Sequence, residues 1–131
     1  MKQPRIIHVD DCQDIRMLVQ IALETVAGLV LVQFESGEDA VKEAEFAEAD
    51  VFLLDVMMPG LTGPQTFERL RAIPKFASTP AIFLTAKATQ KELKELDGPG
   101  VIGTITKPFD AMLLGEQVVA LWQAHAMNAA A

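Results

Sequence analysis

The stretch that decides the fold is Val51-Phe52-Leu53-Leu54-Asp55, followed at once by Val56-Met57-Met58-Pro59-Gly60. Consecutive apolar residues without polar alternation are typical of a strand covered on both faces, as in a parallel sheet. The aspartate ends the apolar run, and the proline and glycine then mark a loop. The sequence therefore predicts a buried strand over Val51–Leu54 that places Asp55 at one edge of a sheet.

Four similar runs are predicted as strands: Arg5–Val9, Leu29–Phe34, Ala81–Leu84 and Val101–Ile105. Helical patterns separate them. Regular alternation of strands and helices implies right-handed crossovers and a parallel sheet with helices on both faces. Five such units fit an α/β, flavodoxin-like, doubly wound (βα)5 sandwich with strand order 2-1-3-4-5.

Helix start signals and apolar stripes support the helices between the strands. Ser36, Thr62 and Thr89 are each followed three positions later by Asp, Gln or Glu, the pattern of a capping box. Two stripes at helical spacing are predicted to face the core. They are Ile15, Leu18, Ala22 and Val26 in the first helix, and Leu114, Val118 and Leu121, extended by Trp122, in the fifth.

Length and composition predict one domain, residues 1–131, with a core over about 5–125 and a tail at 126–131. Asn128 to Ala131 is expected to be a frayed end or a cloning remnant.

The net charge of −7 disfavours nucleic-acid binding. No apolar run approaches the roughly 20 residues of a membrane span, no signal peptide precedes the first strand, and the single Cys12 cannot form an internal disulfide. A cytoplasmic protein is predicted.

Polar residues gather where the predicted strands end. Asp10 and Asp11 follow the first strand, Asp55 ends the third, Thr85 ends the fourth, and Lys107 follows the fifth. In an open parallel sheet, ligands bind beyond these carboxyl ends. Each residue alone has a simpler explanation as a turn former, a helix cap or a solvated charge. Their joint placement at one edge favours a binding site.

Three crowded carboxylates repel one another, and a hard cation relieves that repulsion. Mg²⁺ bound through carboxylates, waters and a phosphate is the commonest solution. The site contains no His or Cys, which disfavours zinc. His8 is interpreted as a core or edge residue within the first strand, and His125 as an exposed residue near the end of the last helix.

These motifs resemble the receiver domain of two-component response regulators, of the single-domain, chemotaxis-regulator type, from about Arg5 to Trp122. The matching pieces are Val9-Asp10-Asp11, Leu54-Asp55-Val56-Met57-Met58-Pro59-Gly60, Leu84-Thr85-Ala86 and Thr106-Lys107-Pro108-Phe109. The resemblance implies that the protein is a phosphoacceptor in a phosphorelay rather than an enzyme. Its phosphoryl donor would be a sensor histidine kinase or a histidine phosphotransfer protein.

The resemblance also implies a role for each matched residue. Mg²⁺, for which Mn²⁺ can substitute, would be held directly by Asp11, Asp55 and the backbone carbonyl of Met57, and through water by Asp10. Asp55 would accept the phosphoryl group. Lys107 and Thr85 would contact its oxygens, and the Lys107-Pro108 peptide bond is expected to be cis.

The family's usual output surface comprises the fourth helix, fifth strand and fifth helix. Met112 and Val119 are either exposed on it or partly buried under neighbouring loops. At the position three before the lysine, where many members have an aromatic residue, this chain has Thr104, so the usual threonine–aromatic switch lacks its aromatic residue. Met57 and Lys87 occupy the positions that tune phosphate lifetime, and slow loss of phosphate is predicted.

Three rival interpretations remain. Gly98-Pro99-Gly100-Val101-Ile102-Gly103 fits the GxGxxG string of dinucleotide sites, but it follows a helix and enters a strand, which is the wrong context. A flavin carrier would need a phosphate-cradling loop where this chain has Asp10-Asp11-Cys12-Gln13-Asp14. A degenerate receiver that acts as an interaction scaffold without phosphorylation is the main alternative.

Overall fold

The fold is a five-stranded parallel sheet, described by a computed structural model over residues 2–86 and 89–130. Lys87 and Ala131, which two of the predictions include, lie outside these described residues. The strands are β1 (Arg5–Val9), β2 (Val30–Phe34), β3 (Val51–Asp55), β4 (Ala81–Thr85) and β5 (Val101–Thr106). Their order, β2-β1-β3-β4-β5 with every pair parallel, confirms the predicted topology.

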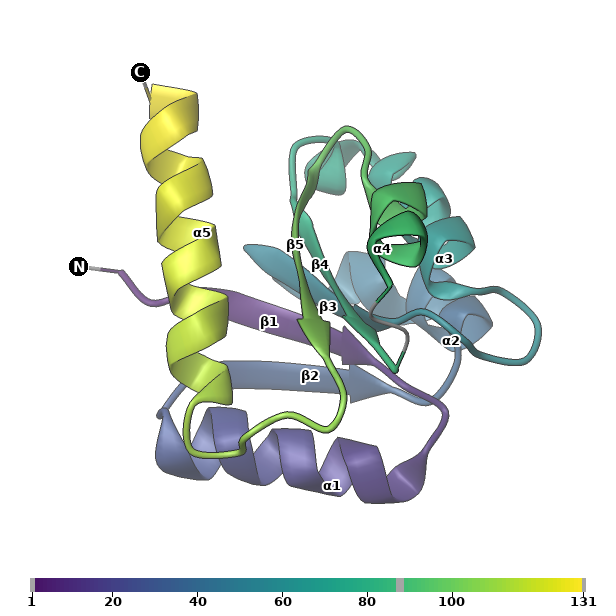
Figure 1. Ribbon diagram of the computed structural model, residues 1–131. Helices are drawn as coiled ribbons and strands as arrows, with labels where there is room; N and C mark the ends of the chain where they lie inside the picture. Colours follow the sequence, from purple (N-terminus) through teal and green to yellow (C-terminus); the bar gives the residue numbers. More distant parts are fainter. Residues whose placement is uncertain (1, 87–88, 131) are drawn as a thin grey trace.

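Helices cover both faces of the sheet (Figure 1). One face carries α1 (Gln13–Gln20), its π-helical continuation η1 (Ile21–Val26) and α5 (Leu114–Ala130). The other carries α2 (Gly37–Glu43), α3 (Gly63–Arg71) and α4 (Gln90–Leu96), with 3-10 turns η2 (Ala44–Phe46) and η3 (Pro74–Phe76) after α2 and α3. In the part of the chain that the structure describes, no helix is long and apolar enough to cross a membrane.

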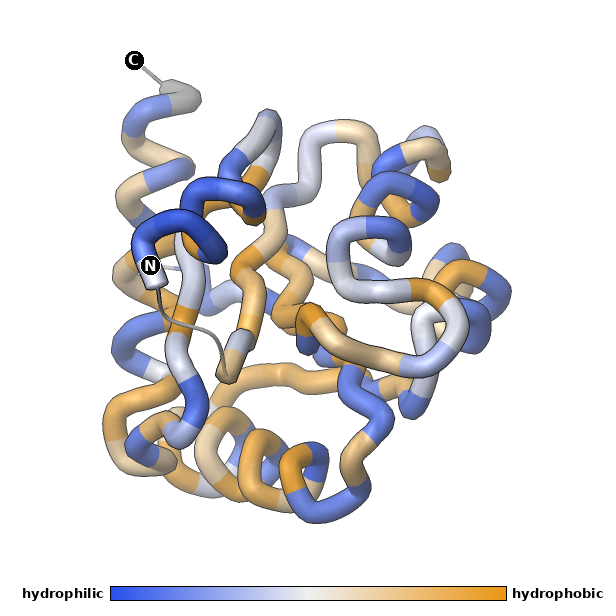
Figure 2. The backbone as a smooth tube through the Cα atoms, turned by 45° about the vertical axis from the view of Figure 1, so that its right-hand side comes forward, coloured by the Kyte–Doolittle hydropathy of each residue, from blue (hydrophilic) through white to orange (hydrophobic). Residues whose placement is uncertain are grey.

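Alternate residues of the strands feed two apolar clusters, one on each face of the sheet. Ile6 packs with the cluster that includes α1 and α5, whereas the next residue, Ile7, packs with the cluster that includes α2 and α3. Hydrophobic colours accordingly run through the middle of the molecule (Figure 2). The central strands β1, β3 and β4 are buried almost throughout, while the edge strands β2 and β5 are mostly half-buried.

Side-chain caps begin three of the helices as predicted. Thr62 and Gln65 form a complete capping box at α3, in which each side chain accepts a hydrogen bond from the other residue's backbone N–H. At α2 and α4 the cap is one-sided, and the hydroxyls of Ser36 and Thr89 accept from the backbone three residues on. Each such cap stabilises its helix by about 1 kcal/mol.

The inner face of α1 and η1 differs from the predicted stripe. Leu18 and Val26 were expected to face the core but are 46% and 41% exposed, whereas Val19 and Leu23 are fully buried beside the correctly predicted Ala22. The reason is that apolar residues occupy two adjacent stripes of this helix, and spacings of three and four residues fit both. Packing in the cluster that this helix shares with the sheet and α5 buries the second stripe.

α5 continues to Ala130 without a break, so residues 126–130 of the predicted tail are helical. Alanine is the best helix former, and residues 126–130 contain neither glycine nor proline to stop the helix. His125, expected to be exposed, is half-buried and lines a hollow with Ile102 and Leu121. The inner stripe itself is confirmed, since Leu114 and Val118 are fully buried.

The Gly98–Gly103 string forms a turn and the start of a strand. It follows the end of α4 and enters β5, and Gly100 adopts a left-handed backbone with φ +83°. Glycine adopts that conformation without steric cost. The string therefore shapes the α4–β5 connection and does not open a helix as a dinucleotide site requires.

Candidate functional site

The carboxyl ends of β1, β3 and β4 and the loop after β5 enclose a cavity of about 350 Å³. The structure brings together at this cavity all six residues for which the sequence predicted a role in metal or phosphoryl binding: Asp10, Asp11, Asp55, Met57, Thr85 and Lys107. The complete lining is Asp10, Asp11, Cys12, Ile15, Asp55, Val56, Met57, Thr85, Ala86 and Lys107.

Three carboxylates crowd one side of this cavity. One oxygen from each of Asp10, Asp11 and Asp55 lies within 4.8 Å of the other two. Asp10 is fully buried and Asp55 is 6% exposed, whereas Asp11 faces solvent. Burial disfavours a charged carboxylate, and neighbouring negative charges disfavour it further.

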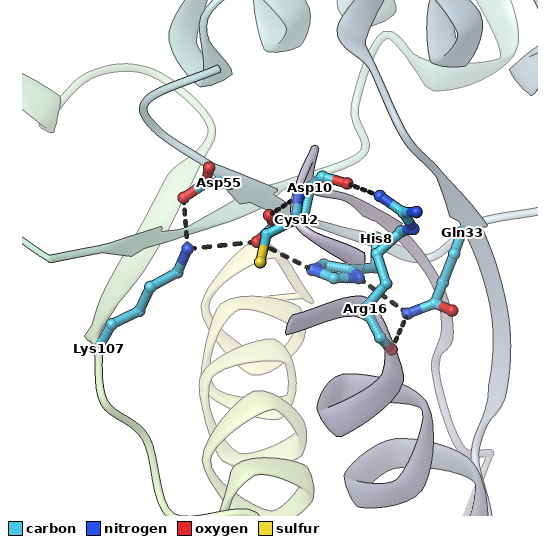
Figure 3. Close-up of polar contacts among 7 residues, drawn as sticks. All are labelled: His8, Asp10, Cys12, Arg16, Gln33, Asp55 and Lys107. Carbon is cyan, nitrogen blue, oxygen red and sulfur yellow. Dashed lines mark hydrogen bonds and ion pairs between the residues drawn. The ribbon is translucent and has the colours of Figure 1, made fainter. Parts of the chain in front are cut away.

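Lys107 supplies the opposing charge. Its Nζ donates to Asp55 Oδ1 at 2.7 Å and to Asp10 Oδ2 at 3.3 Å (Figure 3). Its backbone N–H donates to the carbonyl of Thr85 at 2.8 Å, and the following bond to Pro108 is cis as predicted. Burial opposes the charged ammonium, but the hydrogen bond to Asp55 and the charge of Asp10 outweigh it and raise the pKa of Lys107. The lysine is therefore a fixed positive charge.

Asp55 remains electrostatically strained despite that partner. Burial raises the pKa of its carboxyl, and the charges of Asp10 and Asp11 act in the same direction, while the Lys107 hydrogen bond only partly offsets them. A shifted acid in a cleft beside a fixed cation is typical of a functional group. Any added cation that reaches the three carboxylates would relieve this strain.

Local backbone contacts hold the carboxylates in place. The backbone N–H of Cys12 donates to Asp10 Oδ1 at 2.9 Å, which fixes one oxygen of the buried acid. Gly63 begins α3 directly against the end of β3, and a Cβ built there would lie 2.4 Å from the carbonyl oxygen of Asp55. Only glycine allows this close approach, so α3 starts beside the loop that carries Met57.

Thr85 and Met57 occupy the rim from two further sides. Thr85 is the last residue of β4 and is 2% exposed, whereas Met57 in the loop after β3 is 64% exposed. Met57 has an apolar side chain that cannot orient a water by a strong hydrogen bond. Its backbone carbonyl oxygen, by contrast, is a group that can bind a cation.

Thr104 lies on β5 beside a separate open groove between β5 and α5, lined also by Pro108, Phe109 and Leu121. Thr104 is half-buried, and because threonine is small, no large side chain occupies this position. On the neighbouring face, Met112 is 67% exposed while Val119 is half-buried against the α1–α5 cluster. Of the two alternatives for these residues, exposure therefore applies to Met112 and partial burial to Val119.

Sequence reasoning missed a polar network behind Asp10. His8 is fully buried, its Nδ1 lies 3.0 Å from Gln33 Nε2, and its Nε2 lies 3.9 Å from Asp10 Oδ2 (Figure 3). Arg16 donates to the backbone carbonyl of Asp10 at 2.7 Å. One signal was available, because residues two apart in a strand share a face and His8 is two before Asp10.

The donor set fits a hard divalent cation. The converging side-chain groups are oxygens. Cys12 lines the cavity, contrary to the expectation of a site without Cys, but no thiol or imidazole joins the three carboxylates in the described residues. Carboxylates plus water and carbonyl oxygens are the ligands of Mg²⁺. Asp10, Asp11 and Asp55 are the groups that could hold such an ion.

A family model described as the response regulator receiver domain matches residues 6–119. Among curated relatives, the chemotaxis protein CheY of Pseudomonas aeruginosa is 26% identical over 91% of this chain and 96% of its own. The sensor protein GacS of Pseudomonas syringae is 35% identical over 97% of this chain, which spans only 14% of that protein. The solved structure of chemotaxis protein CheY4 of Vibrio cholerae superposes with a TM-score of 0.83 at 28% identity, covering 92% of this chain and 99% of the other.

Proposed function

The chain belongs to the receiver-domain family of two-component response regulators, and from this premise we propose that it accepts a phosphoryl group on Asp55 in a Mg²⁺-dependent reaction. The observation that carries the proposal is the placement of the Asp55 carboxylate. It lies between the Lys107 ammonium at 2.7 Å and the oxygens of Asp10 and Asp11. A nucleophilic oxygen between fixed charges is the arrangement that phosphoryl transfer requires.

The transfer exchanges one bond to phosphorus for another. An Asp55 oxygen attacks the phosphorus of a phosphohistidine, the O–P bond forms, and the P–N bond breaks. The imidazole nitrogen leaves with the bonding electron pair and takes up a proton. Bound Mg²⁺ would neutralise charge on the phosphoryl oxygens.

Lys107 and Thr85 act on the transferred group. The ammonium can turn from Asp55 to a phosphoryl oxygen without leaving the cavity, because both lie within its reach. The Thr85 hydroxyl is on the same wall and can donate to another oxygen. Since the Lys107 N–H is bonded to the Thr85 carbonyl, movement of either residue is transmitted to the loops after β4 and β5.

The proposed partners follow from this chemistry. The donor is a sensor histidine kinase or a histidine phosphotransfer protein, and the output partner is a protein that binds the α4–β5–α5 surface in the cytoplasm. The chain spans nearly all of CheY but one seventh of GacS, so both a stand-alone regulator and a module of a larger sensor are compatible. Phosphotransfer profiling against histidine kinases of the same cell identifies the donor.

The direct test treats the protein with a small phosphodonor and Mg²⁺ and measures intact mass. We expect the native protein to gain one phosphoryl group and Asp55→Asn to gain none, because the amide is not a nucleophile. Asp14→Asn is the matched control, since Asp14 is an exposed acid in the first turn of α1 outside the cluster. No gain on the native protein, or an equal gain on Asp55→Asn, would favour the scaffold alternative.

Slow loss of phosphate is expected because Met57 cannot orient an attacking water. Met57→Asn should shorten the half-life of the phosphorylated protein by about fivefold, since one net hydrogen bond contributes about 1 kcal/mol. The measurement is the decay of phosphorylated protein after the donor is removed, with Met57→Leu as the apolar control. A half-life of seconds for the native protein alone would contradict the prediction.

A further inference from the structure

His8 and Asp10 form a buried polar pair behind the proposed metal site. They lie two positions apart at the end of β1, on the face that packs with α1 and α5, and both are fully buried. Water cannot satisfy a group buried to this extent, so the polar atoms of His8 depend on protein partners. Among the residues that the structure describes, His8 Nε2 is the buried side-chain nitrogen that has no hydrogen-bond partner.

The network around His8 fixes which ring nitrogen carries the proton. Gln33 lies opposite His8 on β2, and its Nε2 donates to the backbone carbonyl of Arg16 at 2.8 Å. A carbonyl oxygen only accepts, so the group that faces it must be the amide NH₂. The second hydrogen of the same nitrogen points to His8 Nδ1 at 3.0 Å. Nδ1 is therefore the acceptor, and the proton of a neutral ring sits on Nε2.

A charged imidazole buried to this extent, with no hydrogen-bonded counter-charge, would be costly, so the ring is assigned as neutral. A neutral Nε2–H is a dipole that supports a carboxylate without adding a charge. It can therefore orient Asp10 without electrostatic repulsion of a divalent cation. The Lys107 ammonium, by contrast, repels such a cation.

We propose that His8 is a positioning residue whose Nε2–H faces the Asp10 carboxylate and keeps it directed at the metal site. The proposal rests on the function inferred above. The two atoms are 3.9 Å apart, and Lys107 contacts the same Asp10 oxygen at 3.3 Å. Once the ammonium turns to a phosphoryl oxygen, Asp10 retains the Cys12 N–H as a hydrogen-bond donor, and the His8 Nε2–H is the other polar group that faces it.

Mg²⁺ titration by calorimetry tests the donor. His8→Met replaces the imidazole with an apolar side chain of similar length that has no donor. We expect the dissociation constant for Mg²⁺ to rise about tenfold, as is usual when an outer partner of a ligand is removed. His8→Gln places an N–H₂ near the former Nε2 and should recover most of that loss. Ile7→Val is the matched control, because Ile7 is a buried neighbour on the opposite face of β1, and its affinity should equal the native value.

The imidazole tautomer provides a second readout that does not depend on the metal. Nitrogen NMR of the native protein should show the proton on Nε2, and Gln33→Leu should release this preference. Equal Mg²⁺ affinity of His8→Met and His8→Gln, or a proton on Nδ1 in the native protein, would overturn the inference while leaving the proposed function intact. A native protein that does not bind Mg²⁺ would instead overturn the function, and the NMR spectrum would still decide the direction of the His8 donor. If His8→Met does not fold, the spectrum and the affinity of Gln33→Leu decide the inference.

Discussion

Lys107→Met is expected to slow phosphorylation of Asp55 by about 100- to 1,000-fold while binding Mg²⁺ more tightly than the native protein. The slower reaction follows because the ammonium is a preorganised positive charge beside the attacking oxygen, and removing one such group typically costs that factor. The tighter binding follows because the cation would use the carboxylates that the ammonium contacts, Asp55 and Asp10. Unit charges about 4 Å apart near a protein surface interact by about 4 kcal/mol, so a gain of at least about tenfold is expected.

The opposite signs of the two effects separate electrostatics from simple damage to the fold. Mg²⁺ affinity by calorimetry and the initial rate of phosphorylation at saturating Mg²⁺ are measured on the same preparation. Lys42→Met is the control, because Lys42 is an exposed lysine of α2 outside the cavity. Weaker Mg²⁺ binding by Lys107→Met would show that the lysine supports the acid cluster rather than competing for it.

Much of the fold could be predicted because the central strands are uninterrupted apolar runs with a carboxylate or hydroxyl at the end. Burial on both faces makes such a run independent of register, so β3 and β4 were readable without knowledge of their neighbours. Helix phase was different. Leu18 and Val19 are both apolar, and only tertiary packing against the sheet and its helices decides which one is buried. The end of α5 was predictable from alanine propensity, and that signal was overlooked.

The convergence of Asp10, Asp55 and Lys107 followed from topology alone, because the carboxyl ends of neighbouring parallel strands share one edge. The His8 network did not follow, since it depends on cross-strand register. His8 pairs with Gln33 on β2, and a shift of one residue would send the glutamine to the other face. The family resemblance offered no help there, because none of its motifs includes either residue.

Asp11→Asn should weaken Mg²⁺ binding by at least about 100-fold. Removing an outer partner of a ligand already costs roughly 10- to 100-fold, and Asp11 supplies one of the three converging oxygens itself. Calorimetric titration measures the loss. The same change should make the protein slightly more stable when Mg²⁺ is absent, by less than about 1 kcal/mol, because Asp11 is exposed to solvent.

The stabilisation has a defined pH dependence. The pKa of Asp55 is raised by burial and further by Asp10 and Asp11. A carboxyl whose pKa is higher in the folded state contributes stability below its unfolded pKa and loses that contribution as the pH rises through the folded value. Replacing Asp11 lowers the folded pKa of Asp55 towards its normal value. Above the folded pKa of Asp55 the variant therefore has a higher free energy of unfolding than the native protein, and at pH values below the unfolded pKa this difference vanishes.

Added Mg²⁺ should reverse the ranking of the two proteins. An ion that binds only the folded state stabilises it by about 1.4 kcal/mol at ten times the dissociation constant, which the native protein gains and Asp11→Asn does not. Urea unfolding with chelator and then with Mg²⁺, at pH values on both sides of the Asp55 pKa, measures the crossing, with Asp14→Asn as the control that should follow the native protein. Curves that do not cross would contradict either the repulsion of Asp55 by Asp11 or the binding of the ion by Asp11, and the measurement that fails to show its expected shift identifies which. On the proposed function, the carboxylate that destabilises the empty fold would thus also hold the cation, which would tie the stability of this domain to its capacity for phosphoryl transfer.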